Sequence, residues 1–126
     1  MKHTIEFDEA NEICFVHVTG NHKRPEDSLV LQKLARDIGD TRGFRRFLFD
    51  MAQANIISED TDTYEVGTVP ADSDRSQLQQ KIALVYSDDI SEHKFLETIA
   101  VNRGYQLRIF NKMNEAIEWL KQRTTT

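Results

Sequence analysis

The sequence is poor in the features that cross-link a chain or anchor it in a membrane. Its 126 residues include a single cysteine, Cys14, so no disulfide can form within the chain. No run approaches the roughly 20 apolar residues that a membrane-spanning helix needs. The opening segment MKHTIEFDEA also lacks the apolar stretch of a secretory signal. We therefore expect no integral membrane segment and a cytoplasmic location.

Glycine and histidine are too scattered to form the common cofactor sites. The five glycines make neither a dinucleotide fingerprint nor a phosphate loop. None of the four histidines has a second histidine, cysteine or acid at a ligand spacing, and His17 is predicted to be partly buried with its hydrogen bonds satisfied. Cys14 lies in the apolar run ICFVHV and is predicted to be a buried, inert thiol. We expect no cofactor and no metal.

Common catalytic motifs are missing as well. The chain has no G-x-S-x-G elbow and no plausible cysteine–histidine pair, so we expect no enzyme activity. Asp plus Glu number 21 against 16 Lys plus Arg, and the formal charge of −5 argues against a polyanion ligand. The basic clusters His22–Arg24 and Arg42–Arg46 flank one predicted helix and are interpreted as solvated loop charge. No nucleic-acid partner is expected.

What the sequence does contain is a regular alternation of strand and helix patterns. Two β-rich runs around the turn DEAN predict a hairpin, and the later elements alternate in the order ββαβαβαβα. The predicted elements after the hairpin are a helix ending near Gly39, a strand over Phe44–Met51, helical pieces near Ser58 and over Ser73–Gln80, a strand over Lys81–Tyr86, a helix from Asp89 to Gly104, a strand over Tyr105–Phe110, and a helix capped by Asn111.

This order predicts the fold class. Strands that alternate with helices pair in parallel through right-handed crossovers, and the hairpin adds an antiparallel strand. We expect an α/β fold with a mixed sheet of about five strands and helices packed on it. With 39% hydrophobic residues the chain can bury one core, so residues 1–123 are predicted to form a single domain and residues 124–126 a frayed tail.

The run Ser58–Thr63 gathers acids and hydroxyls directly after a buried strand. It fits three interpretations: a phosphorylation switch, a carboxylate site for metal or catalysis, or the acidic first turn of a helix, which the helix dipole stabilises. Asp60 and Asp62 are spaced like the first two ligands of a calcium loop. However, Tyr64 and Glu65 occupy the positions that need an oxygen ligand and a glycine.

Three segments, together with the hairpin, resemble the STAS fold, and more closely its stand-alone SpoIIAA-like (STAS/SEC14-like) bacterial branch. They are FRRFLFDMAQA, KIALVYSDDISEHKFLETIAVNRG and LRIFNKMNEAIEWLK. The resemblance implies a small cytoplasmic regulatory domain that acts through a protein partner or through self-association as a homodimer, in the manner of an anti-sigma-factor antagonist.

In that family, the resemblance implies a phosphorylatable serine within the motif Asp-Ser-Ser-Gly. On this sequence the motif falls on Ser58–Thr61, where Glu59 or Asp60 takes the place of the acceptor serine. An acid carries permanently part of the charge that phosphorylation would add. We therefore predict a constitutively acidic partner surface without the usual phosphoserine, unless another hydroxyl serves. The predicted surface comprises Ser58, Glu59, Asp60, Thr61 and Thr63.

The SEC14-like label implies an alternative function, a carrier or sensor of a lipid-like or small apolar ligand. A gap beside the sheet would be lined by Phe49, Met51, Ile57 and Tyr64, for which plain core packing is the competing interpretation. A third hypothesis is a hydrolase that uses Asp50 together with the acidic run.

Overall fold

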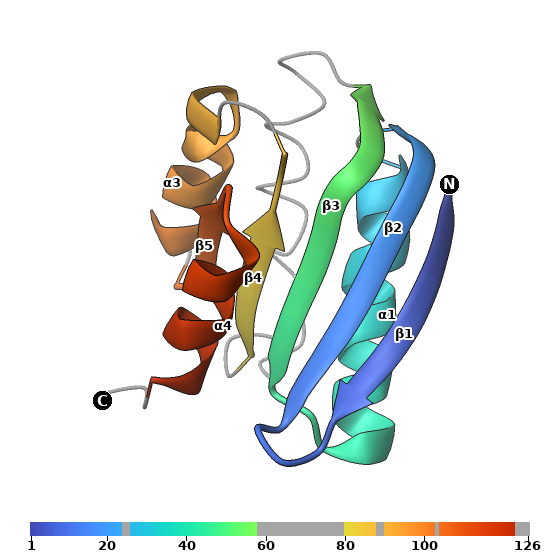
Figure 1. Ribbon diagram of the computed structural model, residues 1–126, viewed down its shortest axis with the longest axis vertical. Helices are drawn as coiled ribbons and strands as arrows, with labels where there is room; N and C mark the ends of the chain where they lie inside the picture. The colour runs from blue at the N-terminus through green and yellow to red at the C-terminus, as the bar shows by residue number, and fades with distance from the viewer. Residues whose placement is uncertain (24–25, 58–79, 88–89, 103, 123–126) are drawn as a thin grey trace.

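A five-stranded mixed sheet organises the chain (Figure 1). The computed structural model describes residues 1–23, 26–57, 80–87, 90–102 and 104–122. The strands follow one another in space as they do in sequence, with β1 antiparallel to β2 and every later neighbour parallel. This confirms the predicted fold class. The strands are β1 (Lys2–Asp8), β2 (Ile13–Lys23), β3 (Arg46–Ile57), β4 (Lys81–Val85) and β5 (Gln106–Phe110).

Helices cover the two faces of the sheet unequally. The described helices are α1 (Glu26–Arg42), the 3-10 turn η3 (Ile90–Glu92), α3 (Lys94–Asn102) and α4 (Met113–Lys121). Right-handed crossovers that always step the same way along a sheet leave their helices on one face, and α1 and α3 share one core. The final helix, α4, returns over the opposite face in front of β4 and β5, while α1 lies behind β1, β2 and β3 (Figure 1).

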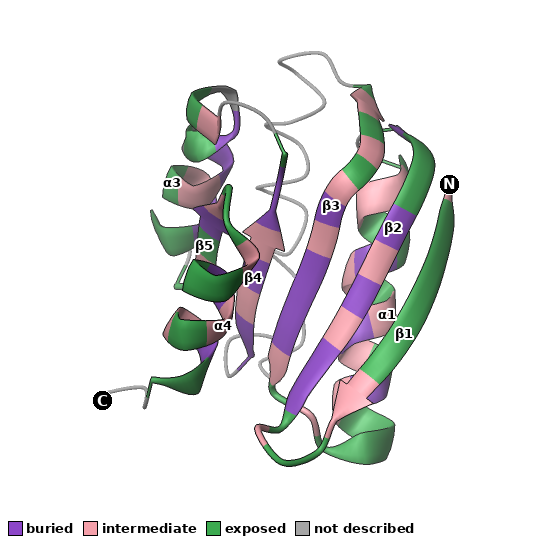
Figure 2. Ribbon diagram, viewed as in Figure 1, coloured by how far each residue is buried: buried purple, intermediate pink, exposed green. Residues whose placement is uncertain are grey.

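The sheet has a hydrophobic core on each face. Strand β3 contributes side chains to both cores, because its side chains alternate between the faces of the sheet. Phe47 and Phe49 point into the core beneath α1, and Leu48 points into the core beneath α4. Phe47 and Leu48 are fully buried, with 0% exposure each. Figure 2 shows this buried centre on β2, β3 and β4, whereas β1 is exposed over most of its length.

The structure corrects the predicted end of the first helix. We expected α1 to stop near Gly39, but it runs to Arg42 and is closed by Gly43, whose φ is +75° and whose N–H bonds to the Gly39 carbonyl at 3.0 Å. Gly39 instead allows a close approach. The Gln80 amide donates to the Ala35 carbonyl at 2.9 Å, and a Cβ on Gly39 would lie 2.6 Å from the Gln80 Nε2.

Other predicted boundaries also shift. The strand expected to end at Met51 continues to Ile57, because β2 itself continues to Lys23 and pairs with it. Helix α4 begins after Lys112, which makes no side-chain capping bond, rather than after Asn111. The helical pieces predicted near Ser58 and from Ser73 lie outside the described residues, apart from Gln80, which directly precedes β4.

Lys81 anchors the end of α4 to the sheet. Its ammonium donates to the Trp119 carbonyl and, at 3.0 Å, to the Gln122 carbonyl, and it lies 4.5 Å from the centre of the Trp119 ring. These carbonyls belong to the last turn of the helix, where intrahelical donors run out and positive charge is favourable. Burial lowers the pKa of Lys81, and the nearby Arg46 lowers it further.

Candidate functional site

The carboxyl ends of β2 and β3 project beyond the rest of the sheet. Strand β4 pairs with β3 only from Arg46 to Asp50. Beyond that point, within the described residues, β3 pairs only with β2, from Gln53 opposite Thr19 to Ile57 opposite Lys23. Figure 1 shows β3 rising past β4. This region, Gln53–Ile57 of β3 with Thr19–Lys23 of β2, is called the projecting ladder below.

Hydrogen bonds tie one strand of the projecting ladder to α1, and the end of the other strand is exposed. His22 is buried, and its Nε2 lies 2.9 Å from the Ser28 hydroxyl of α1. The Lys23 N–H donates to the Asp27 carboxylate at 2.7 Å, which ties the end of β2 to the first turn of α1. Between the two strands, the exposed Asn55 Nδ2 donates to Asn21 Oδ1 at 3.1 Å. Ile57, the last residue of β3, is 43% exposed.

The predicted partner surface directly follows this exposed end in the sequence. Ser58 comes next after Ile57, and Ser58, Glu59, Asp60, Thr61 and Thr63 all lie outside the described residues. The structure therefore places the last residue before the predicted surface, at the carboxyl end of β3, and leaves the surface itself a prediction.

The residues predicted for an apolar pocket occupy different environments. Phe49 and Met51 are 3% and 4% exposed and belong to the core beneath α1. Ile56 packs against the same core, so Ile57 points to the opposite face of the ladder. Tyr64 lies outside the described residues. The structure thus brings Phe49 and Met51 together in the core and separates Ile57 from them.

Asp50 takes part in a network that the sequence spacing did not reveal. His17 and Asp50 are direct neighbours across β2 and β3, and His17 Nδ1 lies 3.0 Å from Asp50 Oδ2. The other ring nitrogen, Nε2, lies 3.2 Å from Glu6 Oε2 of β1. The second Asp50 oxygen accepts the Ala52 N–H at 3.1 Å. One imidazole therefore links three strands on the sheet face opposite α1.

The network favours the protonated form of His17. The hydrogen bond to Asp50 raises the pKa of His17, and Glu6 raises it further, although partial burial opposes both. An imidazolium can donate to both carboxylates at once, whereas a neutral ring has one N–H for the two. The prediction that His17 is partly buried and hydrogen-bonded is confirmed, since its side chain is 32% exposed.

This geometry predicts a pH dependence of stability. Because the folded pKa of His17 lies above its ordinary value of 6.5, its contribution is complete below that value and is lost as pH rises through the folded pKa. The stability of the wild type relative to His17→Gln should therefore fall as the pH rises from below 6.5 to above the folded pKa of His17. Urea unfolding across that range measures it. An NMR titration should show the His17 pKa falling in Asp50→Asn, and an unchanged pKa would contradict the account.

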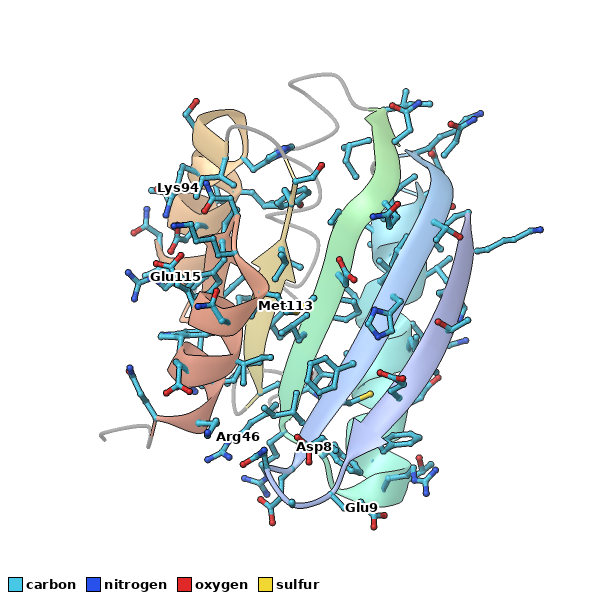
Figure 3. All side chains as sticks on the ribbon, in the orientation of Figure 1. Asp8, Glu9, Arg46, Lys94, Met113 and Glu115 are labelled. Carbon is cyan, nitrogen blue, oxygen red and sulfur yellow. The ribbon has the colours of Figure 1, made fainter. Side chains whose placement is uncertain are left out.

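Cys14 and two arginines, Arg42 and Arg46, serve the fold. Burial raises the pKa of the Cys14 thiol to about 11, so the thiol stays protonated and inert at neutral pH, as predicted. The Arg42 guanidinium lies 4.2 Å from the centre of the Phe7 ring, and Arg46 donates to the Asn11 carbonyl at 2.8 Å. These arginines fasten the hairpin to the rest of the fold, and Figure 3 shows Arg46 and Asp8 at the same end of the sheet.

The described part of the chain lacks two kinds of feature. It contains no group of three or more His, Cys, Asp or Glu side chains placed to hold a metal ion. None of its helices is long and apolar enough to cross a membrane.

Comparison with known proteins identifies the fold. No family model and no curated protein matches the sequence. The structure is similar to that of an uncharacterized protein of the DUF3478 family with a SpoIIAA-like fold from Shewanella loihica PV-4. The two share 12% sequence identity over 94% of this chain and 92% of the other, with a TM-score of 0.57. The chain therefore has a SpoIIAA-like fold, as its resemblance to the STAS branch implied.

Proposed function

We propose that the chain is a small, non-enzymatic regulatory domain that binds a protein partner at the end of the projecting ladder. Ser58, Glu59, Asp60, Thr61 and Thr63 would supply the contacts. The observation that carries the proposal is the position of Ile57, exposed at the carboxyl end of β3 and directly before this acidic run. In open α/β sheets, ligands bind outside the carboxyl ends of the strands.

The setting of Asp50 supports binding rather than hydrolysis. One Asp50 oxygen faces His17 and the other accepts a backbone N–H, so both are engaged within the sheet. Both ring nitrogens of His17 face carboxylates. A histidine that activates a nucleophile needs a hydroxyl or thiol within hydrogen-bond reach. Among the described residues, none lies at either nitrogen of this ring.

The carrier alternative has less support from the described residues. Phe49 and Met51 would have to leave a buried core that also contains Leu31, Ala35 and Ile38 of α1. An apolar ligand site needs a cavity rather than packed side chains. Native mass spectrometry of protein purified from its own host tests this alternative, because a bound ligand would appear as an adduct of constant mass.

Charge reversal tests the proposed partner surface. The double variant Glu59→Lys, Asp60→Lys should lose at least about 90% of the partner captured by the wild type from a host lysate, because it replaces two attractive charges with repulsive ones. The partner is identified by mass spectrometry of the wild-type capture, and its affinity is then measured for each variant.

The matched control carries the same change of charge elsewhere. Asp37 and Asp40 are exposed on α1, so Asp37→Lys, Asp40→Lys should retain the partner. Equal capture by all three proteins would contradict the proposal. Turnover in a phosphatase and esterase screen that disappears in Asp50→Asn would replace it with a hydrolase.

A further inference from the structure

Strand β1 leaves one edge of the sheet open. It pairs with β2 along its whole length, from Lys2 opposite Thr19 to Asp8 opposite Ile13. No strand pairs with its other edge within the described residues. Residues 2–6 are exposed, and Figure 2 shows most of the strand in the exposed colour. An open edge presents backbone N–H and C=O groups that another strand can pair with.

The sequence of β1, KHTIEFD, is complementary to itself when reversed. With Ile5 at the centre of an antiparallel pair, Lys2 of each copy lies opposite Asp8 of the other. Thr4 lies opposite Glu6, and Ile5 meets its own copy. No like charges face each other in this register. Directly opposite residues share a face of a sheet, so each pair forms on a common face.

Asp8 and Ile5 suit this pairing, because Asp8 carries a fixed charge and Ile5 has exposed apolar surface. Asp8 accepts two hydrogen bonds from Asn11, from the backbone N–H at 3.2 Å and from Nδ2 at 2.9 Å, and these fix the carboxylate. Figure 3 shows Asp8 at the hairpin end of β1. The same bonds lower the pKa of Asp8, so the carboxylate stays charged. Ile5 is 36% exposed, and a symmetric pair would cover its apolar surface.

We propose that β1 pairs antiparallel with β1 of a second copy of this chain, which gives a two-fold symmetric dimer with one continuous sheet. Other registers give less favourable side-chain pairs or a shorter overlap. A shift that centres the pair on Glu6 places two glutamates opposite each other, and a shift that centres it on Thr4 shortens the overlap. A two-fold interface must match itself, and the register centred on Ile5 meets that condition with opposite charges at both ends.

Cross-linking of the full chain tests this register. Ile5→Cys places two thiols at the two-fold axis, where directly opposite Cβ atoms lie about 4.5–5.5 Å apart. Under mild oxidation, the disulfide dimer should form at least about tenfold faster than in Val30→Cys, a control that is 49% exposed on α1. Cys14 does not compete, since its thiol is buried and stays protonated. Equal rates in the two variants would overturn the proposal.

Sedimentation provides an independent readout. The wild type should show a concentration-dependent monomer–dimer equilibrium. Lys2→Glu should raise the dimer dissociation constant at least about tenfold, because symmetry turns two attractive pairs into two repulsive ones. Lys33→Glu, the same change at an exposed position of α1, should leave the constant unchanged. A wild type that stays monomeric at millimolar concentration would overturn the proposal. The test involves β1 alone, so it is independent of the partner surface proposed above.

Discussion

Replacing Phe47 with alanine is expected to lower the free energy of unfolding by about 3–5 kcal/mol. Phe47 is fully buried, and in the described part of the chain it is the largest of the fully buried side chains. Its ring lies 6.4 Å from the ring of Phe49 in the core beneath α1. Since β3 is paired on both sides at this residue, the backbone has little freedom to collapse into the cavity.

Urea unfolding monitored by circular dichroism measures this loss. The control is Leu29→Ala on α1, where the leucine is 36% exposed and the expected loss is below about 1 kcal/mol. A loss of that small size in Phe47→Ala would show that the core beneath α1 is not packed as described.

The second large effect is expected from Leu120→Ala, with a loss of about 2–5 kcal/mol. Leu120 is fully buried and joins Ala116 in fixing α4 on the opposite face of the sheet. That core is the smaller of the two, so few other contacts compensate for the cavity. Lys81 continues to bond the last carbonyls of the helix, which should keep α4 formed although less firmly docked.

Hydrogen exchange distinguishes undocking of α4 from global unfolding. In Leu120→Ala, amides of α4 should exchange faster than those of β3, whereas in Phe47→Ala both should change together. Val101→Ala is the control, since Val101 is 52% exposed on α3 and should cost below about 0.5 kcal/mol. Equal acceleration of α4 and β3 in Leu120→Ala would contradict a separate second core.

Much of the fold follows from local patterns. Leu107 and Ile109 alternate with polar residues along β5, and the structure packs both against the core beneath α1. The element order predicted the mixed sheet, because parallel strands need crossover helices. The prediction that α1 ends near Gly39 was wrong for a physical reason. A glycine that admits a neighbouring side chain looks in sequence like one that ends a helix, and only the contact with Gln80 distinguishes them.

The site was less predictable. The link between His17 and Asp50 depends on the pairing register of β2 and β3, and the two residues are 33 positions apart in the sequence. The predicted strand ended at Met51 because the aromatic and apolar run ends there. The extension to Ile57 depends instead on β2, which offers a pairing partner as far as Lys23. A long-range partner of this kind leaves no periodic signal in a short window.

We have proposed that a protein partner binds where β3 ends. Hydrogen–deuterium exchange of the full chain, with and without the partner identified by affinity capture, tests it most directly. Partner binding should slow exchange at residues 53–63 at least about tenfold, while amides of β5 remain unchanged. Slowing confined to other surfaces, with residues 53–63 unaffected, would contradict it.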